Sequence, residues 1–362
     1  DVTYDQTQLD EYVERVLQLE AVACKDWLTN KVDRSVTGKI ARQQCQGEIQ
    51  LPLSDCGVVA LDYRGRAGIA TSIGHAPQAA LVDPAAGSVL SIAEALTNIV
   101  WAPLSEGLDS VSLSANWMWP CKNEGEDARL YRAVEACSDF ACSLRINIPT
   151  GKDSLSMTQK YGKDKVYSPG TVIISAGAEV SDIRKVVSPV LRTGVNSTIY
   201  YIDFSFDKLK LGGSAFAQSL DKIGKEVPTV QDSEYFANAF NAVQELINKE
   251  LILAGHDISA GGMITTMLEM NFANTEGGLE VSLDEIPEKD LVKILFSENP
   301  GILIQVEKTD EVEKILKKAG VAFIRLARPC DERHLLIHKD GADYQFFIDH
   351  LRDVWFESSY LL

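Results

Sequence analysis

The stretch SIAEALTNI, residues 91–99, says most about how this chain is built. It lies in an apolar run that follows Pro84 and stops at Pro103, which predicts a helix. Glu94 and Asn98 place a carboxylate and a carboxamide at positions i and i+4, on one helix face with Cβ atoms about 6 Å apart. The two side chains could share one hard cation. A position on the solvent-exposed side of an amphipathic helix would explain this pair of residues equally well.

Two aspartates elsewhere change the interpretation of this pair. Asp55, in PLSDCGVVALD, follows Pro52 in a turn that enters an apolar strand, so its carboxylate is expected at the mouth of that strand. Asp257, in AGHDISAGGM, stands before a Gly-Gly helix start, where free N–H groups can bind phosphate. Either aspartate alone is explained as a turn or N-cap residue. Together with Glu94 and Asn98 they would form a cage of oxygen ligands, as a Mg-nucleotide requires.

Three other features leave alternatives open. The stretch PTGKDSLSM, residues 149–157, is either an ordinary β-turn or a loop that holds an anion with its amides and lysine. It is not a Walker A loop, because Ile146 and Asp153 occupy positions that require glycine and Ser/Thr. LGGSAFAQ, residues 211–218, is a flexible turn before a helix or a ligand loop. His256 is an acid/base candidate or a hydrogen-bonded structural residue.

Length, charge and cysteine content limit the classes of protein to which this chain can belong. The chain of 362 residues suggests about two domains, and its formal charge of −17 argues against nucleic acid and anionic membranes as partners. Seven scattered cysteines without a C-x-x-C pair indicate reduced thiols and a cytoplasmic location. No apolar run is long enough to span a membrane. Because the sequence starts at Asp1 without Met, we expect it to be a piece of a longer protein.

The pattern of apolar residues predicts three segments. Residues 8–30 have helical spacing, so residues 1–35 are expected to be a leading helix and linker. Glycine-punctuated strands, including VVALDYRGRAGIATSIG as a hairpin, predict a β-rich lobe over residues 36–195. Strands alternate with helices beyond Asn196, which predicts a layered α/β lobe over residues 196–362.

An ordered set of motifs resembles one family over nearly the whole chain. In order, they are SVTGKIARQQCQG, PLSDCGVV, SIAEALTNI, LSANWM, GEDARLY, PTGKDSLSM, LGGSAFAQ and GHDISAGG. This set resembles the synthetase region of large formylglycinamide ribonucleotide amidotransferases, also called phosphoribosylformylglycinamidine synthases. That region holds two pairs of lobes similar to aminoimidazole ribonucleotide synthetase, and the chain resembles the second pair. The resemblance implies an α+β or α/β architecture of two lobes.

The resemblance also implies roles for particular residues. In the family, the metal of the nucleotide site in this half is held by four side chains that fall on Asp55, Glu94, Asn98 and Asp257. Nucleotide contacts fall on Ser54, Ser259 and Lys25. The implied cofactors are Mg²⁺ and ATP or ADP.

The family's reaction sets the expected function. An ATP-dependent C–N ligase converts the amide of formylglycinamide ribonucleotide to an amidine in purine biosynthesis, using ammonia from glutamine. The chain lacks the glutaminase domain and the first pair of lobes, which are its expected partners. We therefore expect this half to hold an auxiliary nucleotide and to be inactive alone. The alternatives are a stand-alone small-molecule kinase or synthetase of the same superfamily and a non-catalytic module stabilised by nucleotide.

Overall fold

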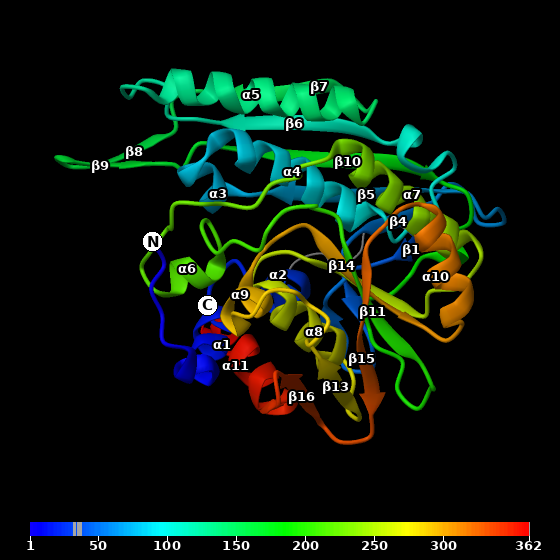
Figure 1. Cartoon of the computed structure of the whole chain (residues 1–362). Helices are drawn as coiled ribbons and strands as arrows, with labels where there is room; N and C mark the ends of the chain where they lie inside the picture. Colours follow the sequence, from blue (N-terminus) through cyan, green and yellow to red (C-terminus); the bar gives the residue numbers. More distant parts are fainter. Residues whose placement is uncertain (32–33, 35–37, 362) are drawn as a thin grey trace.

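The computed structural model describes residues 1–31, 34 and 38–361 and folds them into two lobes that lie against each other (Figure 1). The predicted boundary between residues 35 and 36 lies outside the described residues, as does part of the motif SVTGKIARQQCQG. All seven cysteines are free thiols, in agreement with the sequence. Among the described helices, none is both long and apolar enough to cross a membrane.

The first lobe is built on a mixed sheet with one covered face. Its described strands lie in the order β1-β4-β5-β10-β6-β7, and all neighbours are antiparallel except β6 and β7. Buried and exposed residues alternate along β5, which shows that one face of the sheet packs inward. The expected hairpin is confirmed as β4 and β5. The strand bounds are β1 Ile40–Arg42, β4 Gly57–Ala60, β5 Gly68–His75, β6 Ser112–Met118, β7 Asn147–Ser154 and β10 Thr171–Val180.

Helix α4 (Pro84–Ile99) covers the inner face of this sheet (Figure 1). Asp83 caps its N-terminus by accepting a hydrogen bond from the Ala85 N–H at 2.9 Å, and the proline at the first helical position suits the helix start. A Cβ on Gly74 of β5 would lie 2.2 Å from the backbone oxygen of Ser91. Only glycine therefore lets the strand approach this helix so closely.

Shorter elements complete the first lobe. α5 (Glu126–Ser143) packs on α4, and α3 (Pro77–Val82) precedes α4. β8 (Thr158–Tyr161) and β9 (Asp164–Tyr167) form a hairpin that projects from the lobe (Figure 1). β2 (Cys45–Gln46) pairs with β3 (Leu51–Pro52). Single 3₁₀ turns lie at Gln6–Gln8, Gly107–Ser110 and Ile183–Lys185.

The stretch PTGKDSLSM corrects an expectation. Its residues 149–154 belong to strand β7, at the edge of the first sheet, and are neither a tight turn nor an anion loop. A Cβ on Gly151 would lie 2.4 Å from the backbone oxygen of Ala115, so glycine here permits close pairing with β6. The Lys152 ammonium donates to the Ser154 hydroxyl on the same strand. Residues that are common in turns therefore take part in strand pairing here.

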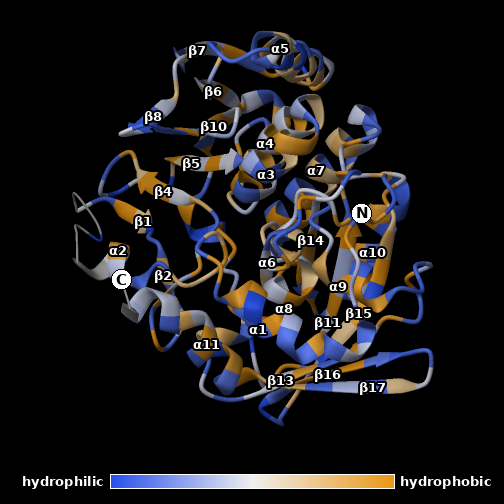
Figure 2. Cartoon of the chain, turned by 90° about the vertical axis from the view of Figure 1, so that its left-hand side faces the viewer, coloured by the Kyte–Doolittle hydropathy of each residue, from blue (hydrophilic) through white to orange (hydrophobic). Residues whose placement is uncertain are grey.

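The second lobe has helices on both faces of a sheet with the order β12-β14-β11-β15-β13-β16-β17. Every described neighbour pair in it is antiparallel except β13 with β16, so the lobe is α+β. Its strand β14, next to the edge strand β12, is wholly buried and coloured mainly toward the hydrophobic end in Figure 2. The strand bounds are β11 Thr198–Asp203, β12 Ala254–Ile258, β13 Gly278–Ser282, β14 Gly301–Val306, β15 Phe323–Cys330, β16 His334–Lys339 and β17 Ala342–Phe347.

The helices of the second lobe divide between two hydrophobic cores. α7 (Ser233–Asn248) and α10 (Thr309–Lys318) share a core with the first lobe, where Phe236 packs edge-to-face on Phe140 of α5. α8 (Gly262–Phe272), α9 (Leu291–Phe296) and the short α6 (Ala215–Ser219) belong to the other core. LGGSAFAQ is thus a turn that leads into a helix. Because one core crosses between the lobes, the division near Asn196 stays a prediction.

The first and last helical segments of the chain pack on each other (Figure 1). The predicted helix over residues 8–30 is wrong in extent, because it consists of α1 (Leu9–Leu17) and α2 (Asp26–Lys31) with a break between them. The break is fixed by α11 (Ile348–Leu361): the Trp355 indole donates to the Val22 carbonyl at 2.9 Å, and the Cys24 N–H donates to the Trp355 carbonyl at 3.0 Å.

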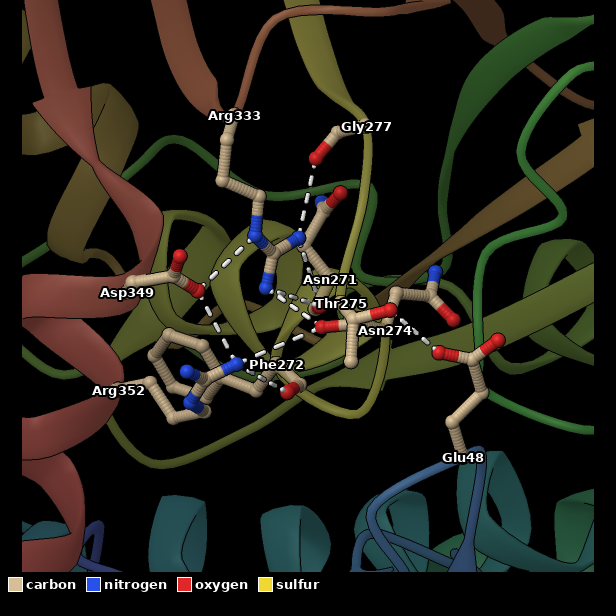
Figure 3. A network of polar contacts seen from close by, with 9 residues as sticks. All are labelled: Glu48, Asn271, Phe272, Asn274, Thr275, Gly277, Arg333, Asp349 and Arg352. Carbon is tan, nitrogen blue, oxygen red and sulfur yellow. Dashed lines mark hydrogen bonds and ion pairs between the residues drawn. The ribbon is translucent and has the colours of Figure 1, made fainter.

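A polar cluster around Arg333 fixes the C-terminal end of α8 (Figure 3). The Arg333 guanidinium donates to the carbonyls of Asn271, Asn274 and Gly277 at 2.7–3.2 Å. Its Nε lies 3.0 Å from Asp349 Oδ1, which also pairs with Arg352 at 3.1 Å. The last carbonyls of a helix have no partners within it, so this arginine fork satisfies them.

Candidate metal and nucleotide site

Glu94 and Asn98 lie on one face of α4 and are both fastened to the end of β5. Glu94 Oε2 accepts a hydrogen bond from the His75 N–H at 2.6 Å. The Asn98 amide nitrogen donates to the Ile73 carbonyl at 3.1 Å, so its side-chain oxygen points the other way. Each side chain therefore keeps one oxygen for another partner, as the i and i+4 spacing suggested.

Asp55 and Asp257 meet at the seam between the lobes. Asp55 lies in the turn before β4 of the first lobe, and Asp257 lies in β12 at the edge of the second sheet. Ligand atoms of Asp55, His256 and Asp257 all lie within 4.8 Å of one another. One oxygen of each aspartate, Oδ2, is buried and has no hydrogen-bond partner among the described residues. Buried polar atoms without partners are rare and costly, so these two atoms need a ligand.

His256 holds the cluster together through contacts with three carboxylates. Its Nδ1 lies 2.7 Å from Asp55 Oδ1 and 3.5 Å from Asp257 Oδ1, and its Nε2 lies 3.0 Å from Glu269 Oε2. Burial would lower the pKa of His256, but Asp55 and Glu269 raise it well above its ordinary value. These carboxylates therefore favour the charged form of the ring. This geometry favours the structural interpretation of His256 over the acid/base one.

The carboxylates of the site carry more negative charge than the protein neutralises. Burial raises the pKa of Asp55, Glu94 and Asp257, and the neighbouring carboxylates of Asp55 and Glu94 raise that of Asp257 further. Like charges in a buried site disfavour the ionised form unless a cation balances them. A bound divalent cation would supply that balance. Carboxylate and carboxamide oxygens are the ligands that Mg²⁺ prefers, so the donor set fits this ion.

Two cavities are lined by residues of the proposed site. Glu94 and Ser259 line one of about 190 Å³, together with the turn residues Gly212 and Gly213. Asp55 and Ser54 line another of about 870 Å³, which opens on the uncovered face of the first sheet. The structure thus places Ser259 beside Glu94 and Ser54 beside Asp55.

Lys25 lies apart from these cavities. Its ammonium donates to the Ala23 carbonyl, and burial lowers its pKa while Glu269 partly offsets this effect. Glu269, which contacts His256, is the member of the cluster whose charge acts on Lys25. The structure brings Asp55 and Asp257 together and sets Glu94 near Asp257, whereas Lys25 is separated from the proposed metal ligands.

The sequence analysis missed two carboxylates that support the site. Glu269 is the one charged residue in the apolar stretch MITTMLEMNF, and it faces His256. Glu298 Oε1 accepts hydrogen bonds from the N–H groups of Ala215 and Gly261, both at 2.8 Å. Glu298 thereby ties the LGGSAFAQ turn to the Gly-Gly start of α8. An acidic residue isolated between buried elements was the available signal in both places.

Comparison with known families identifies the class of this two-lobed chain. Residues 24–179 match the FGAR-AT PurM_N-like domain, and residues 196–335 match the C-terminal domain of AIR synthase related proteins. The chain thus has the two domains of an AIR synthase-like protein. It belongs to the phosphoribosylformylglycinamidine synthase family, as its relatives show.

Those relatives come from distant eukaryotes. The chain is 38% identical to the phosphoribosylformylglycinamidine synthase of Homo sapiens over 357 residues and 40% identical to the probable enzyme of Caenorhabditis elegans over 347 residues. These matches cover 97% and 91% of the chain. The chain spans 26% of the length of each relative.

Solved structures confirm the two-lobe fold. PurL of Thermotoga maritima complexed with FGAR superposes with a TM-score of 0.70 at 17% identity, covering 97% of this chain and 54% of that one. The same protein complexed with ATP gives a TM-score of 0.63 at 15% identity, covering 82% and 46%. Hydrogenase maturation protein HypE in complex with ATP gives 0.54 at 14% identity, covering 79% and 86%. At these identities the likeness concerns the fold.

Proposed function

We propose that this chain is the part of an ATP-dependent phosphoribosylformylglycinamidine synthase that holds an auxiliary Mg-nucleotide. The whole protein would convert formylglycinamide ribonucleotide to the amidine, with a first pair of lobes and a glutaminase domain as partners, in the cytoplasm. The observation that carries the proposal is the pair of buried, unpartnered oxygens on Asp55 and Asp257, which come from different lobes. The ATP-bound relatives of the same fold support it.

Each proposed ligand has a distinct part in this site. Asp55 and Asp257 would hold the cation from the two lobes, and Glu94 and Asn98 would complete its oxygen ligands from α4. Ser54 and Ser259 stand beside these ligands, where hydroxyls can bind phosphate oxygens. Bound Mg²⁺ would neutralise phosphate charge that an acidic chain otherwise repels. His256 would hold Asp55 in place through its 2.7 Å contact.

The metal assignment is tested by calorimetry with Mg-ADP on the purified chain. We expect D55A and E94Q each to weaken binding at least tenfold, and D55A to lower the melting temperature in a way that added Mg-ADP does not reverse. D153N is the matched control, because Asp153 is an exposed carboxylate on β7. Unchanged affinity in D55A would exclude Asp55 as a ligand.

The same chain tests whether this half turns over substrate. We expect no amidine when it is given ATP, ammonia and formylglycinamide ribonucleotide, because the productive site is assigned to the first pair of lobes. Measurable turnover would favour the stand-alone synthetase instead. The position of the cluster at the seam of the lobes favours one alternative, a nucleotide-stabilised module. Binding of Mg-ADP without turnover, accompanied by a large rise in melting temperature, is the result expected for it.

A further inference from the structure

A third cavity, also at the seam of the lobes, has the opposite charge to the proposed metal site. It has a volume of about 600 Å³ and lies between β1, the connecting segment 184–192 and the end of α7. Four cationic side chains and one carboxylate line it. These are Arg42, Arg184, Lys185, Arg192 and Glu250. A basic cavity is unusual in a chain whose formal charge is −17, and it attracts anions.

Two of the four cations already have carboxylate partners. Arg184 donates to both oxygens of Asp182 at 2.6 and 2.9 Å. Lys185 lies 3.5 Å from Glu250 and donates to the Asn248 carbonyl at 2.9 Å. These pairs leave the other two arginines as the groups able to bind a ligand.

Arg192 has a fixed backbone and a free guanidinium. Its N–H donates to the side-chain oxygen of the buried Gln305 at 2.8 Å, and its carbonyl accepts from the same amide at 2.8 Å. The Arg192 guanidinium makes no hydrogen bond or ion pair with any residue that the structure describes. A guanidinium on a rigid backbone loses less entropy when it binds an anion.

Arg42 lines both this cavity and the one lined by Asp55 and Ser54, and it has an unused donor. Its two terminal nitrogens donate to Gln46 Oε1 and to the Val186 carbonyl, both at 2.6 Å. Its Nε is buried and has no partner among the described residues. A buried guanidinium N–H without an acceptor costs free energy that a ligand oxygen would recover.

We propose that this cavity binds a phosphorylated small molecule through Arg42 and Arg192. Phosphate oxygens match the planar donors of guanidinium groups, and a volume of about 600 Å³ is in the range of small-molecule sites. The cavity also has an apolar wall, which includes Val187 and Leu191, and this wall could contact the rest of such a ligand. Because Arg42 belongs to the first lobe and Arg192 to the connecting segment, the ligand would join the two.

The test is calorimetry on the whole chain in EDTA, which keeps the metal site out of the measurement. Ribose 5-phosphate and inorganic phosphate are the two probes. We expect at least one to bind with a millimolar or lower dissociation constant. Tighter ribose 5-phosphate would identify a phosphorylated metabolite as the ligand, and equal affinities would identify phosphate itself.

Arginine variants assign the binding to this cavity. We expect R192A to weaken binding at least tenfold and R192K to weaken it less, because lysine keeps the charge without the fork. R132A is the matched control. Arg132 is exposed on α5, so its replacement removes the same charge at a distant position. The proposal is wrong if neither probe binds, or if R192A binds as tightly as R132A. Saturating Mg-ADP should leave the affinity for the phosphate probes unchanged. Displacement of a probe by Mg-ADP would also overturn the proposal, whether or not Asp55 and Asp257 prove to be metal ligands.

Discussion

Two polar clusters of this chain, a partly buried one around Arg333 and a buried one around Asp55 and Asp257, differ in how their charges are balanced. The Arg333 cluster pairs two guanidinium groups with one carboxylate and with the carbonyls at the end of α8 (Figure 3). The aspartate cluster gathers several carboxylates around one histidine and leaves an oxygen of Asp55 and one of Asp257 without partners.

The difference teaches how to separate a structural cluster from a binding site. A polar cluster that is satisfied by its own chain needs no ligand, and its residues act on stability alone. A cluster with excess charge of one sign and unpartnered atoms gains stability when a ligand arrives. Variants of the two clusters should therefore respond to Mg-ADP in opposite ways.

Breaking the Arg333 cluster should have the largest effect on the free energy of unfolding. R333A leaves several carbonyls at the end of α8 unpaired, so we expect a loss of roughly 3 kcal/mol in the free energy of unfolding. Denaturant titration measures this loss, which Mg-ADP should not change specifically. T275V is the control, because Thr275 donates to Glu48 at an exposed position of the same network. An effect of R333A below 1 kcal/mol would contradict this view of the cluster.

Neutralising Asp257 sharpens the contrast. In EDTA we expect D257N to unfold at the same or a slightly higher denaturant concentration than wild type, because it removes one of several like charges. With Mg-ADP at a hundred times its dissociation constant, wild type should gain about 2.7 kcal/mol and D257N almost nothing. Strong destabilisation of D257N in EDTA would instead show that Asp257 is a structural residue like Arg333.

Glu298 should make stability depend on pH. Burial raises its pKa from 4.5 to about 7, so between these values the native chain holds a proton that the unfolded chain releases. This contribution is complete below pH 4.5 and is lost as the pH rises through 7. We expect wild type to lose about 2–3 kcal/mol relative to E298Q over that window in EDTA. Denaturant titrations at several pH values measure the difference, and parallel profiles would contradict the assignment.

Breaking the ion-pair network around Glu313 should have the smallest effect on stability. Glu313 accepts hydrogen bonds from Lys317, Tyr200 and Arg325, which lower its pKa to about 2. Because the side chains of Lys317 and Arg325 are largely exposed to solvent and salt, R325A should cost less than about 1 kcal/mol. Thermal unfolding at low and high salt checks this, and the difference between variant and wild type should shrink as salt rises. A larger loss that persists at high salt would mean that packing dominates.

Local pattern was enough to predict α4, the hairpin of β4 and β5, and the shared face of Glu94 and Asn98. Each of these depends on residues that are close in the sequence. The convergence of Asp55 and Asp257 was expected from the family resemblance, because spacing alone cannot place two residues that are about 200 positions apart.

The errors came from partners that are distant in the sequence. Apolar spacing continues through Val22, but the helix breaks there because Trp355 of α11 takes the Val22 carbonyl. Gly151 belongs to a residue pattern typical of turns, but the backbone of Ala115 needs a glycine opposite it. Glu269 and Glu298 were missed because a single acid in an apolar stretch gives no spacing to recognise.

The docking of α11 on the break between α1 and α2 holds the first helices of the chain in place through its last one. A chain cut after Phe347 would lose both hydrogen bonds of Trp355 at this break, together with the buried indole that packs on Phe272. We expect the leading segment to detach in such a chain, so limited proteolysis should cleave between Leu17 and Asp26 faster than in the intact chain.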